Sequence, residues 1–228
     1  MKNGSTLSSP PSVQVKICGL TRLDEAVACA AQGADAIGLI FYPPSPRFLN
    51  DLAAREICAG LPKSVSKIGV FVNEPYLEVF KRVEFCGLDG VQLHGVESPE
   101  MVEALTAAGI TVIKSLFVNK KPFVADVHLY PASAFLIESG EGPLPGGNAQ
   151  AWNWRSAGKF SDEHPCILAG GLDSDNVSKG IEGFCPDAVD VSSGVETVPG
   201  RKDIGKVTAF LKAVREAKSR REPRRIFR

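Results

Sequence analysis

Short apolar runs recur at regular intervals along the chain and predict β-strands. Several of them, such as Ile-Gly-Leu-Ile-Phe and Ile-Gly-Val-Phe-Val, are apolar without alternation, as expected of parallel strands buried on both faces. Glycine, proline or aspartate marks most of the junctions between these runs and the longer segments that separate them. The pattern predicts eight strands, at residues 13–17, 36–41, 67–72, 90–93, 111–115, 134–137, 165–168 and 188–191.

The segments between the strands are amphipathic and predict helices. Apolar residues follow an i, i+3, i+4, i+7 pattern from Leu23, with Thr21 as the expected N-cap and Gly33 as the expected C-cap. Ser98 is an expected N-cap that precedes a proline at the first helical position. The last helix is expected at 204–217, where the apolar side chains form one stripe.

Successive strands lie roughly 20 to 35 residues apart, which is the length of one βα unit. Eight such units within 228 residues favour an α/β fold with a single (β/α)8 TIM barrel, and a doubly wound open sheet is the alternative. The fifth connection, 119–130, is the weakest helix because it contains Pro122. The expected organisation is a flexible N-terminal segment at 1–12, a catalytic barrel domain at 13–217 and a basic flexible C-terminal tail at 218–228.

Composition and charge narrow the classes of partner. The chain has 26 Lys+Arg and 26 Asp+Glu, and its formal net charge of +0 argues against a broadly basic nucleic-acid binder. The longest apolar stretch, 36–42, is far shorter than the roughly 20 residues that span a bilayer. The first residues lack the apolar region of a secretory signal. These features predict a cytoplasmic protein with neither a membrane nor a nucleic acid as partner.

The cysteines give no metal-binding or disulfide pattern. The chain has 6 cysteines, scattered without a CxxC pair and without nearby paired histidines. A disulfide framework is typical of short secreted chains. We therefore expect no metal, and we expect most of these cysteines to be small buried hydrophobes or reduced thiols.

The active site of an α/β barrel lies at the C-terminal ends of its strands, so the residues that follow each predicted strand are the candidates. Cys18 follows the first strand and can act as a base or nucleophile where nearby dipoles or cations favour its thiolate; a buried structural thiol is the alternative. Arg47 ends a proline-stiffened loop after the second strand. This position suits the presentation of a guanidinium to a carboxylate or phosphate, and a surface arginine is the alternative.

Polar residues also follow the fourth and sixth strands. Gln92 and His94 share one face at the end of the fourth strand, so both are expected to point into the barrel mouth. Glu138 places a carboxylate at the end of the sixth strand, where it can act as a general acid or base; a surface glutamate is the alternative. A glycine-rich loop around Gly147 follows.

Two glycine-rich loops give the strongest signal for a bound ligand. Gly170 and Gly171 follow the seventh strand, and Ser192, Ser193 and Gly194 follow the eighth. Many barrels bind phosphate at these two places, where glycine lets the backbone N–H groups approach and serine hydroxyls add hydrogen bonds. Tight turns alone also explain the glycines. The two loops together predict a phosphate site.

Seven segments occur along the chain in the order KICGLT, SPRFL, GVFVNEP, VQLHG, LAGGLDSDNV, DVSSGVE and PGRKD. Together they resemble the phosphoribosylanthranilate isomerase family, over about residues 15–214. The resemblance implies a cofactor-free Amadori rearrangement in tryptophan biosynthesis. In it, N-(5-phosphoribosyl)anthranilate becomes 1-(2-carboxyphenylamino)-1-deoxyribulose 5-phosphate. The implied partner is this small phosphosugar substrate, and the chain is expected to be a monomer or a homodimer.

The resemblance also implies roles for individual residues. Cys18 matches the general base that removes the proton from C2 of the sugar, and Glu138 stands at the position of the general acid. Arg47 matches the arginine that faces the anthranilate carboxylate, and His94 lies beside the substrate. The expected substrate-binding set, most of it around the phosphate, is completed by Gln92, Gly147, Gly170, Gly171, Ser192, Ser193 and Gly194.

The sequence departs from the family at the acid. The family usually has aspartate at the end of the sixth strand, whereas this chain has Glu138, which has nearly the same intrinsic pKa but reaches one methylene further. This leaves three alternatives open. One is another phosphosugar barrel, such as a pentulose-phosphate epimerase or an indole-glycerol-phosphate synthase. The others are an altered substrate specificity and a non-catalytic phosphate-ligand sensor.

Overall fold

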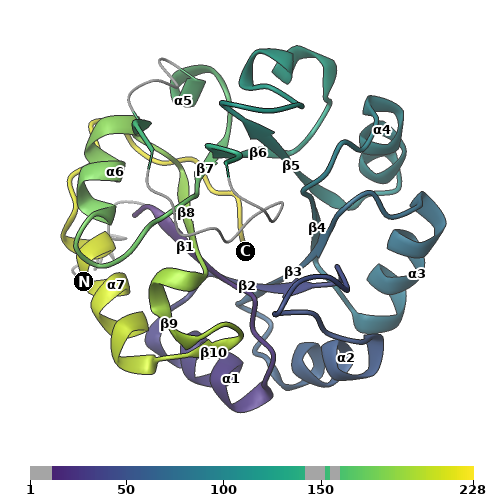
Figure 1. The fold of residues 1–228 in the computed structure, drawn as a ribbon, viewed down its shortest axis with the longest axis horizontal. Coiled ribbons are helices and arrows are strands. Elements are labelled where there is room, and N and C mark those ends of the chain that lie inside the picture. Colours follow the sequence, from purple (N-terminus) through teal and green to yellow (C-terminus); the bar gives the residue numbers. More distant parts are fainter. Residues whose placement is uncertain (1–11, 142–151, 155–159) are drawn as a thin grey trace, which may run out of the picture.

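Eight parallel strands close into a barrel in the computed structural model, which describes residues 12–141, 152–154 and 160–228 (Figure 1). The strands are β1 (Gln14–Cys18), β2 (Ala36–Ile40), β3 (Ser66–Phe71), β4 (Gly90–Leu93), β5 (Thr111–Phe117), β6 (Ala134–Glu138), β7 (Cys166–Leu168) and β8 (Ala188–Val191). β1 pairs with both β2 and β8, so the sheet has no free edge. The prediction of a single (β/α)8 barrel is confirmed, and the open sheet is excluded.

Helices surround the barrel between the strands (Figure 1). They are α1 (Leu23–Gln32), α2 (Asp51–Gly60), α3 (Tyr76–Cys86), α4 (Pro99–Ala107), α5 (Phe160–Glu163), α6 (Val177–Phe184) and α7 (Ile204–Glu216). The weak fifth helix is the 3-10 helix η1 (Val124–Leu129), which begins two residues after Pro122. After β8 come the short 3-10 helix η3 (Ser193–Val195) and the strand pair β9 (Glu196–Val198) and β10 (Arg201–Lys202).

Three predicted helix caps can be compared with the structure. Ser98 caps α4 by accepting from the Met101 N–H, and Gly33 ends α1 at φ 99°, both as predicted. The prediction that Thr21 caps α1 is wrong. Its hydroxyl donates to the Gly200 carbonyl at 2.6 Å, so it is committed to a distant loop, and Arg22 takes the N-cap position.

Apolar side chains fill both sides of the sheet. One cluster lies between the strands and the helices, with members such as Ile37 and Val207 that are fully buried. The second cluster includes Ala36, Ala134 and Ala188, the first residues of β2, β6 and β8. This second cluster therefore fills the lumen at the end where the strands begin. The opposite end is left for polar side chains.

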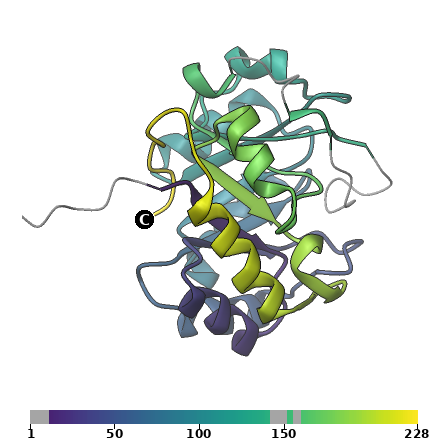
Figure 2. The same cartoon turned by 90° about the vertical axis from the view of Figure 1, so that its left-hand side faces the viewer.

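The C-terminal tail, 218–228, for which flexibility was predicted, packs against the barrel. The tail turns back to the end of the barrel opposite the strand arrowheads (Figure 2). Phe227 is 3% exposed and belongs to the lumen cluster. Gln14 accepts hydrogen bonds from the N–H groups of Ile226 and Phe227 and donates to the Phe227 carbonyl at 3.1 Å.

The arginines of the tail have a buried carboxylate as partner. Asp187, fully buried before β8, accepts from Arg221 Nη1 at 2.7 Å and from the Arg224 N–H at 2.7 Å. Burial alone would raise the pKa of Asp187, but these hydrogen bonds hold it below its usual range. Arg221 and Arg224 thus hold the tail against the barrel through a carboxylate more than 30 positions earlier in the chain.

We expect Phe227→Ala to lower the melting temperature by roughly 6–12 °C. Deleting a buried phenylalanine ring costs about 3 kcal/mol or more, and each kcal/mol shifts the transition of a chain of this size by about 2–4 °C. Calorimetry measures the shift, with Glu222→Ala, an exposed neighbour, as the control. Activity well below the transition should be unchanged, because the tail lies at the end of the barrel opposite the candidate site. Equal melting temperatures for the two variants would contradict the prediction.

Residues 1–11, most of the predicted flexible N-terminal segment, lie outside the described residues. Within the described ranges, no helix is long and apolar enough to cross a membrane.

Candidate active site

The structure brings the predicted polar residues to one end of the barrel. Cys18 and Glu138 are the last residues of β1 and β6, and His94 directly follows β4. Because all eight strands are parallel, their C-terminal ends meet at the same mouth. Arg47 reaches this mouth from the loop between β2 and α2, where its side chain lies against Gly19.

A hydrogen-bonded group surrounds the Glu138 carboxylate. His94 Nδ1 lies 2.8 Å from Gln92 Nε2 and 2.7 Å from Ser115 Oγ, while His94 Nε2 lies 3.5 Å from Glu138 Oε1. The imidazole thus lies between the Gln92 and Ser115 side chains on one edge and the Glu138 carboxylate on the other. All four side chains are buried, which fixes the direction of this carboxylate.

The Cys18 thiol lies in a tight, charged environment. Its side chain is 5% exposed, and a Cβ on Gly38 of β2 would stand only 2.6 Å from its sulfur. Lys16 lies two residues earlier on β1, is fully buried, and forms an ion pair with Asp190 of β8 at 2.8 Å. Burial raises the pKa of Cys18, and the Lys16 ammonium acts against that rise.

Arg47 has a protein carboxylate as its partner. Its Nε and Nη2 donate to the two oxygens of Glu196 at 2.9 and 2.7 Å, and Lys202 Nζ donates to Glu196 at 2.7 Å. Burial alone would raise the pKa of Glu196, but Arg47 and Lys202 lower it. A guanidinium has five N–H groups, so this fork fixes Arg47 and leaves other donors for a ligand.

The two glycine-rich loops lie side by side at the mouth. A Cβ on Gly194 would stand 2.0 Å from the Leu172 carbonyl, so only glycine allows the loops after β7 and β8 to approach this closely. Gly170 and Gly171 have φ of 90° and 65°, in the region that favours glycine. Ser192 Oγ is buried and has no partner among the described residues, so it is available to a ligand. Gly147 lies outside the described residues.

Sequence reasoning missed the charged groups that support the site. Lys16, Asp190, Glu196 and Lys202 were not singled out, although all four lie within the recognised motifs or directly beside a predicted site residue. A lysine within the apolar first strand, two residues before Cys18, was a usable signal, because strand alternation puts both side chains on one face. Ser115 gave no such signal, because it joins His94 only in the folded barrel.

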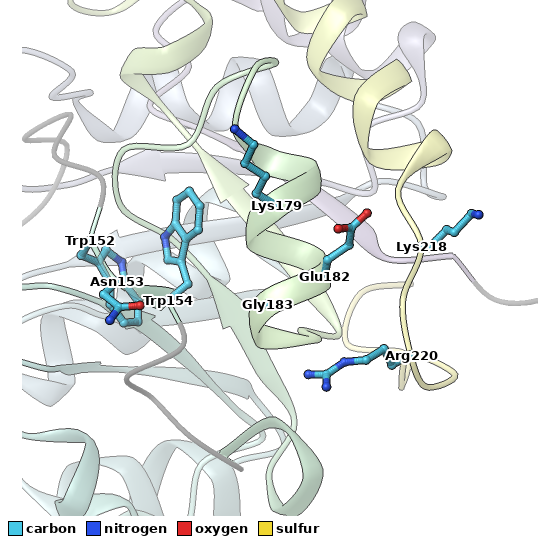
Figure 3. Close-up of a pocket in the computed structure, with 8 residues that line it drawn as sticks. All are labelled: Trp152, Asn153, Trp154, Lys179, Glu182, Gly183, Lys218 and Arg220. Atoms are coloured by element: carbon cyan, nitrogen blue, oxygen red, sulfur yellow. The ribbon is translucent and has the colours of Figure 1, made fainter.

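A cavity of ≈ 1070 Å³ lies beside α6 and the C-terminal tail (Figure 3). It is lined by Trp152, Asn153, Trp154, Lys179, Glu182, Gly183, Lys218 and Arg220. None of the predicted site residues lines it. Across the part of the chain that the structure describes, no cluster of histidine, cysteine or acidic side chains is arranged to hold a metal ion.

A closed parallel barrel with a buried carboxylate, a thiol and paired glycine loops at its strand ends is typical of (β/α)8-barrel enzymes, whose active sites lie at this end. The family model described as N-(5'phosphoribosyl)anthranilate (PRA) isomerase matches residues 15–213. The chain belongs to this family and is an isomerase of tryptophan biosynthesis.

Relatives and solved structures agree with this assignment. A relative from Desulfatibacillum aliphaticivorans, named N-(5'-phosphoribosyl)anthranilate isomerase, is 50% identical over 95% of this chain and 99% of its own length. The crystal structure of phosphoribosyl anthranilate isomerase from Thermotoga maritima has a TM-score of 0.81 at 35% identity, covering 89% of this chain and 98% of that one. A phosphoribosyl anthranilate isomerase in complex with reduced 1-(o-carboxyphenylamino)-1-deoxyribulose 5-phosphate has a TM-score of 0.78 at 35% identity, with the same coverage.

Proposed function

We propose that this chain converts N-(5-phosphoribosyl)anthranilate into 1-(2-carboxyphenylamino)-1-deoxyribulose 5-phosphate, with Glu138 as general acid and Cys18 as general base. The observation that carries the assignment is the placement of these two groups. A buried carboxylate held by His94 ends β6, and a buried thiol ends β1, so the two face one mouth from different strands.

The chemistry needs an acid and a base in turn. Glu138 donates a proton to the furanose ring oxygen, the bond from C1 to that oxygen breaks, and the nitrogen lone pair forms the Schiff base. The Schiff base makes the proton on C2 acidic, and the Cys18 thiolate removes it to give an enol amine. Loss of the enol hydroxyl proton and addition of a proton at C1 give the ketose. The His94 ring, with Nε2 at 3.5 Å from Oε1, keeps the Glu138 carboxyl directed at the mouth.

We place the substrate phosphate between the loops after β7 and β8. Ser192 Oγ is unpartnered among the described residues, and Gly171, Ser193 and Gly194 belong to the same two closely packed loops. Phosphate oxygens accept hydrogen bonds, so this hydroxyl and the backbone N–H groups of the glycine-rich loops suit this end of the substrate. The remaining donors of Arg47 suit the anthranilate carboxylate, and Glu196 holds the guanidinium in the direction needed.

The experiment that tests the function is an isomerisation assay on freshly formed N-(5-phosphoribosyl)anthranilate, together with growth rescue of a tryptophan auxotroph that lacks this isomerase. We expect turnover and rescue by the natural chain, and no rescue by the Glu138→Gln variant. Binding of a phosphate-bearing product analogue without turnover would instead favour the non-catalytic sensor.

Treatment with EDTA is expected to leave the rate of isomerisation unchanged. An acid and a base suffice for this rearrangement, so no step calls for a Lewis acid. The measurement is kcat before and after thorough chelation and dialysis, with a zinc-dependent enzyme treated alongside as control. Loss of turnover that a divalent metal restores would contradict the mechanism and favour an epimerase.

A cytoplasmic location and a monomeric or homodimeric state stay predictions. All six cysteines are free thiols in the structure, which fits a reducing compartment.

A further inference from the structure

Two side chains of β1 enter the lumen together with one side chain of β8. Strand alternation puts Lys16 and Cys18 on the same face, and the register of β1 on β8 places Lys16 opposite Asp190. Lys16 is fully buried, and its Nζ lies 2.8 Å from Asp190 Oδ1. The three residues thus form a buried line of thiol, ammonium and carboxylate.

Gly38 brings the sulfur and the lysine stem together. It is the β2 partner of Cys18, and a Cβ there would stand 2.6 Å from Cys18 Sγ and 3.1 Å from Lys16 Cε. Both atoms therefore occupy the space over Gly38 that a side chain would fill. The ammonium of Lys16 interacts with the Cys18 sulfur as well as with Asp190.

A charged lysine in the barrel lumen is unfavourable unless its charge has a function or a partner. An apolar residue would pack in the lumen without desolvating a charge, and removing a charge from water is unfavourable unless the charge is compensated. Asp190 compensates that charge through one hydrogen bond, but an ammonium has three N–H groups. In a site of low dielectric, the charge of Lys16 acts strongly on a neighbouring sulfur.

We propose that Lys16 is a positioning residue for the base. Its ammonium holds the Cys18 sulfur and stabilises the thiolate, while the negative charge of Asp190 weakens this stabilisation. This role rests on Cys18 being the base. The proposal adds Lys16 to the residues that act in the proton-transfer step, which otherwise comprise the acid Glu138 and the base Cys18.

The charged groups around Cys18 act in opposite directions. Burial raises the pKa of the thiol, Lys16 lowers it, Asp190 raises it, and Lys202 on β10 lowers it. Lys202 is held by Glu196, and Arg47, which also faces the thiol, is held by the same carboxylate. Lys16 is therefore the cation with the largest effect on the sulfur, and the thiol pKa stays above its usual range.

The test is a titration of the Cys18 thiolate by its ultraviolet absorbance. Each protein is measured against the same protein carrying Cys18→Ser, so that the other thiols and tyrosines cancel. Lys16→Met is expected to move the midpoint upward by about one pH unit or more, which is about tenfold less thiolate at a given pH. Lys16→Arg should restore most of the shift. Asp190→Asn should move the midpoint in the opposite direction, because it removes the competing negative charge.

Kinetics gives a second readout. Lys16→Met should lower kcat at least about tenfold near neutral pH with KM little changed, because the thiolate acts in the transition state and not in substrate binding. Lys16→Arg should regain most of the lost rate, in parallel with the restored midpoint. A merely structural lysine would not produce this recovery.

Lys114→Met is the matched control. Lys114 is also fully buried and ion-paired, with Glu97 at 2.8 Å, but it belongs to β5, across the barrel from β1. It should lower the melting temperature while leaving the Cys18 midpoint unchanged. An unchanged midpoint in Lys16→Met, or an equal shift in Lys114→Met, would overturn the proposal.

The test of Lys16 and the test of Cys18 as the base can fail independently. If Cys18→Ala still turns over, Cys18 is not the base, even where Lys16→Met shifts the thiol. If Lys16→Met does not fold, Asp190→Asn decides: a lower midpoint supports the proposal, and an unchanged or higher one overturns it.

Discussion

Replacing Glu138 by glutamine is expected to lower kcat by about 10²–10⁴-fold, the range of a general acid's contribution, with KM little changed. Glutamine keeps the shape of the side chain and its contact with His94, but it has no proton to give to the ring oxygen. Steady-state kinetics on the purified variant measures the effect, and circular dichroism with the melting temperature checks that the fold is intact.

Two further variants sharpen this prediction. Glu138→Asp, which restores the residue usual in the family, should keep partial activity, since a carboxyl displaced by about 1 Å can lose on the order of a hundredfold in rate. Glu141→Gln is the matched control. Glu141 is exposed and accepts from Asn119 Nδ2 at 3.0 Å, away from His94. Normal turnover by Glu138→Gln together with an inactive Glu141→Gln would identify Glu141 as the acid.

Replacing Cys18 by alanine is expected to lower kcat by at least about a hundredfold, because the thiolate removes the C2 proton. Substrate affinity should be nearly unchanged, since the residues proposed to bind the phosphate and the anthranilate carboxylate are not altered. Stopped or continuous assays of isomerisation measure kcat, and binding of a product analogue measures affinity. Near-natural turnover would return Cys18 to the role of a buried structural thiol.

Cys29→Ala is the control for Cys18→Ala. Cys29 is fully buried on α1, outside the barrel lumen, and burial raises its pKa to about 11. Its removal should affect stability and not turnover. For the natural enzyme, the fraction of Cys18 present as thiolate should rise with pH through the alkaline range, because burial raises the pKa of this thiol. This rise, measured by the ultraviolet absorbance of the thiolate, should be absent from Cys18→Ala.

The barrel and the ends of its strands could be predicted from the sequence. The predicted bounds of β4 and β8 are those observed, and the other strands differ by one or two residues. These runs are read locally, because a parallel strand buried on both faces is apolar along its whole length. The same local rule placed Cys18, His94 and Glu138 at the mouth, since each follows or ends its own strand.

The partners of charged residues could not be predicted in this way. Arg47 was expected to face a ligand, and its fork with Glu196 joins residues 149 positions apart. The tail was expected to be flexible because six of its eleven residues are basic. Its arginines instead have Asp187 as partner, and Phe227 fills the floor of the barrel. The charge composition of a segment does not show whether the fold brings a residue of opposite charge next to it.

The sequence by itself therefore determined the order of the strands and the positions of Glu138, Cys18 and the glycine loops at the strand ends, because each depends on residues within one βα unit. The number of units favoured a barrel over an open sheet. Only the tertiary structure decided how these groups are held. Lys16 meets Asp190 across 174 positions, and Gln14 meets Phe227 across 213, because closure of the barrel brings the first strand against the last strand and the tail. Ion pairs and hydrogen bonds form between the side chains that the closed barrel brings into contact. Which side chains meet depends on the fold of the whole chain.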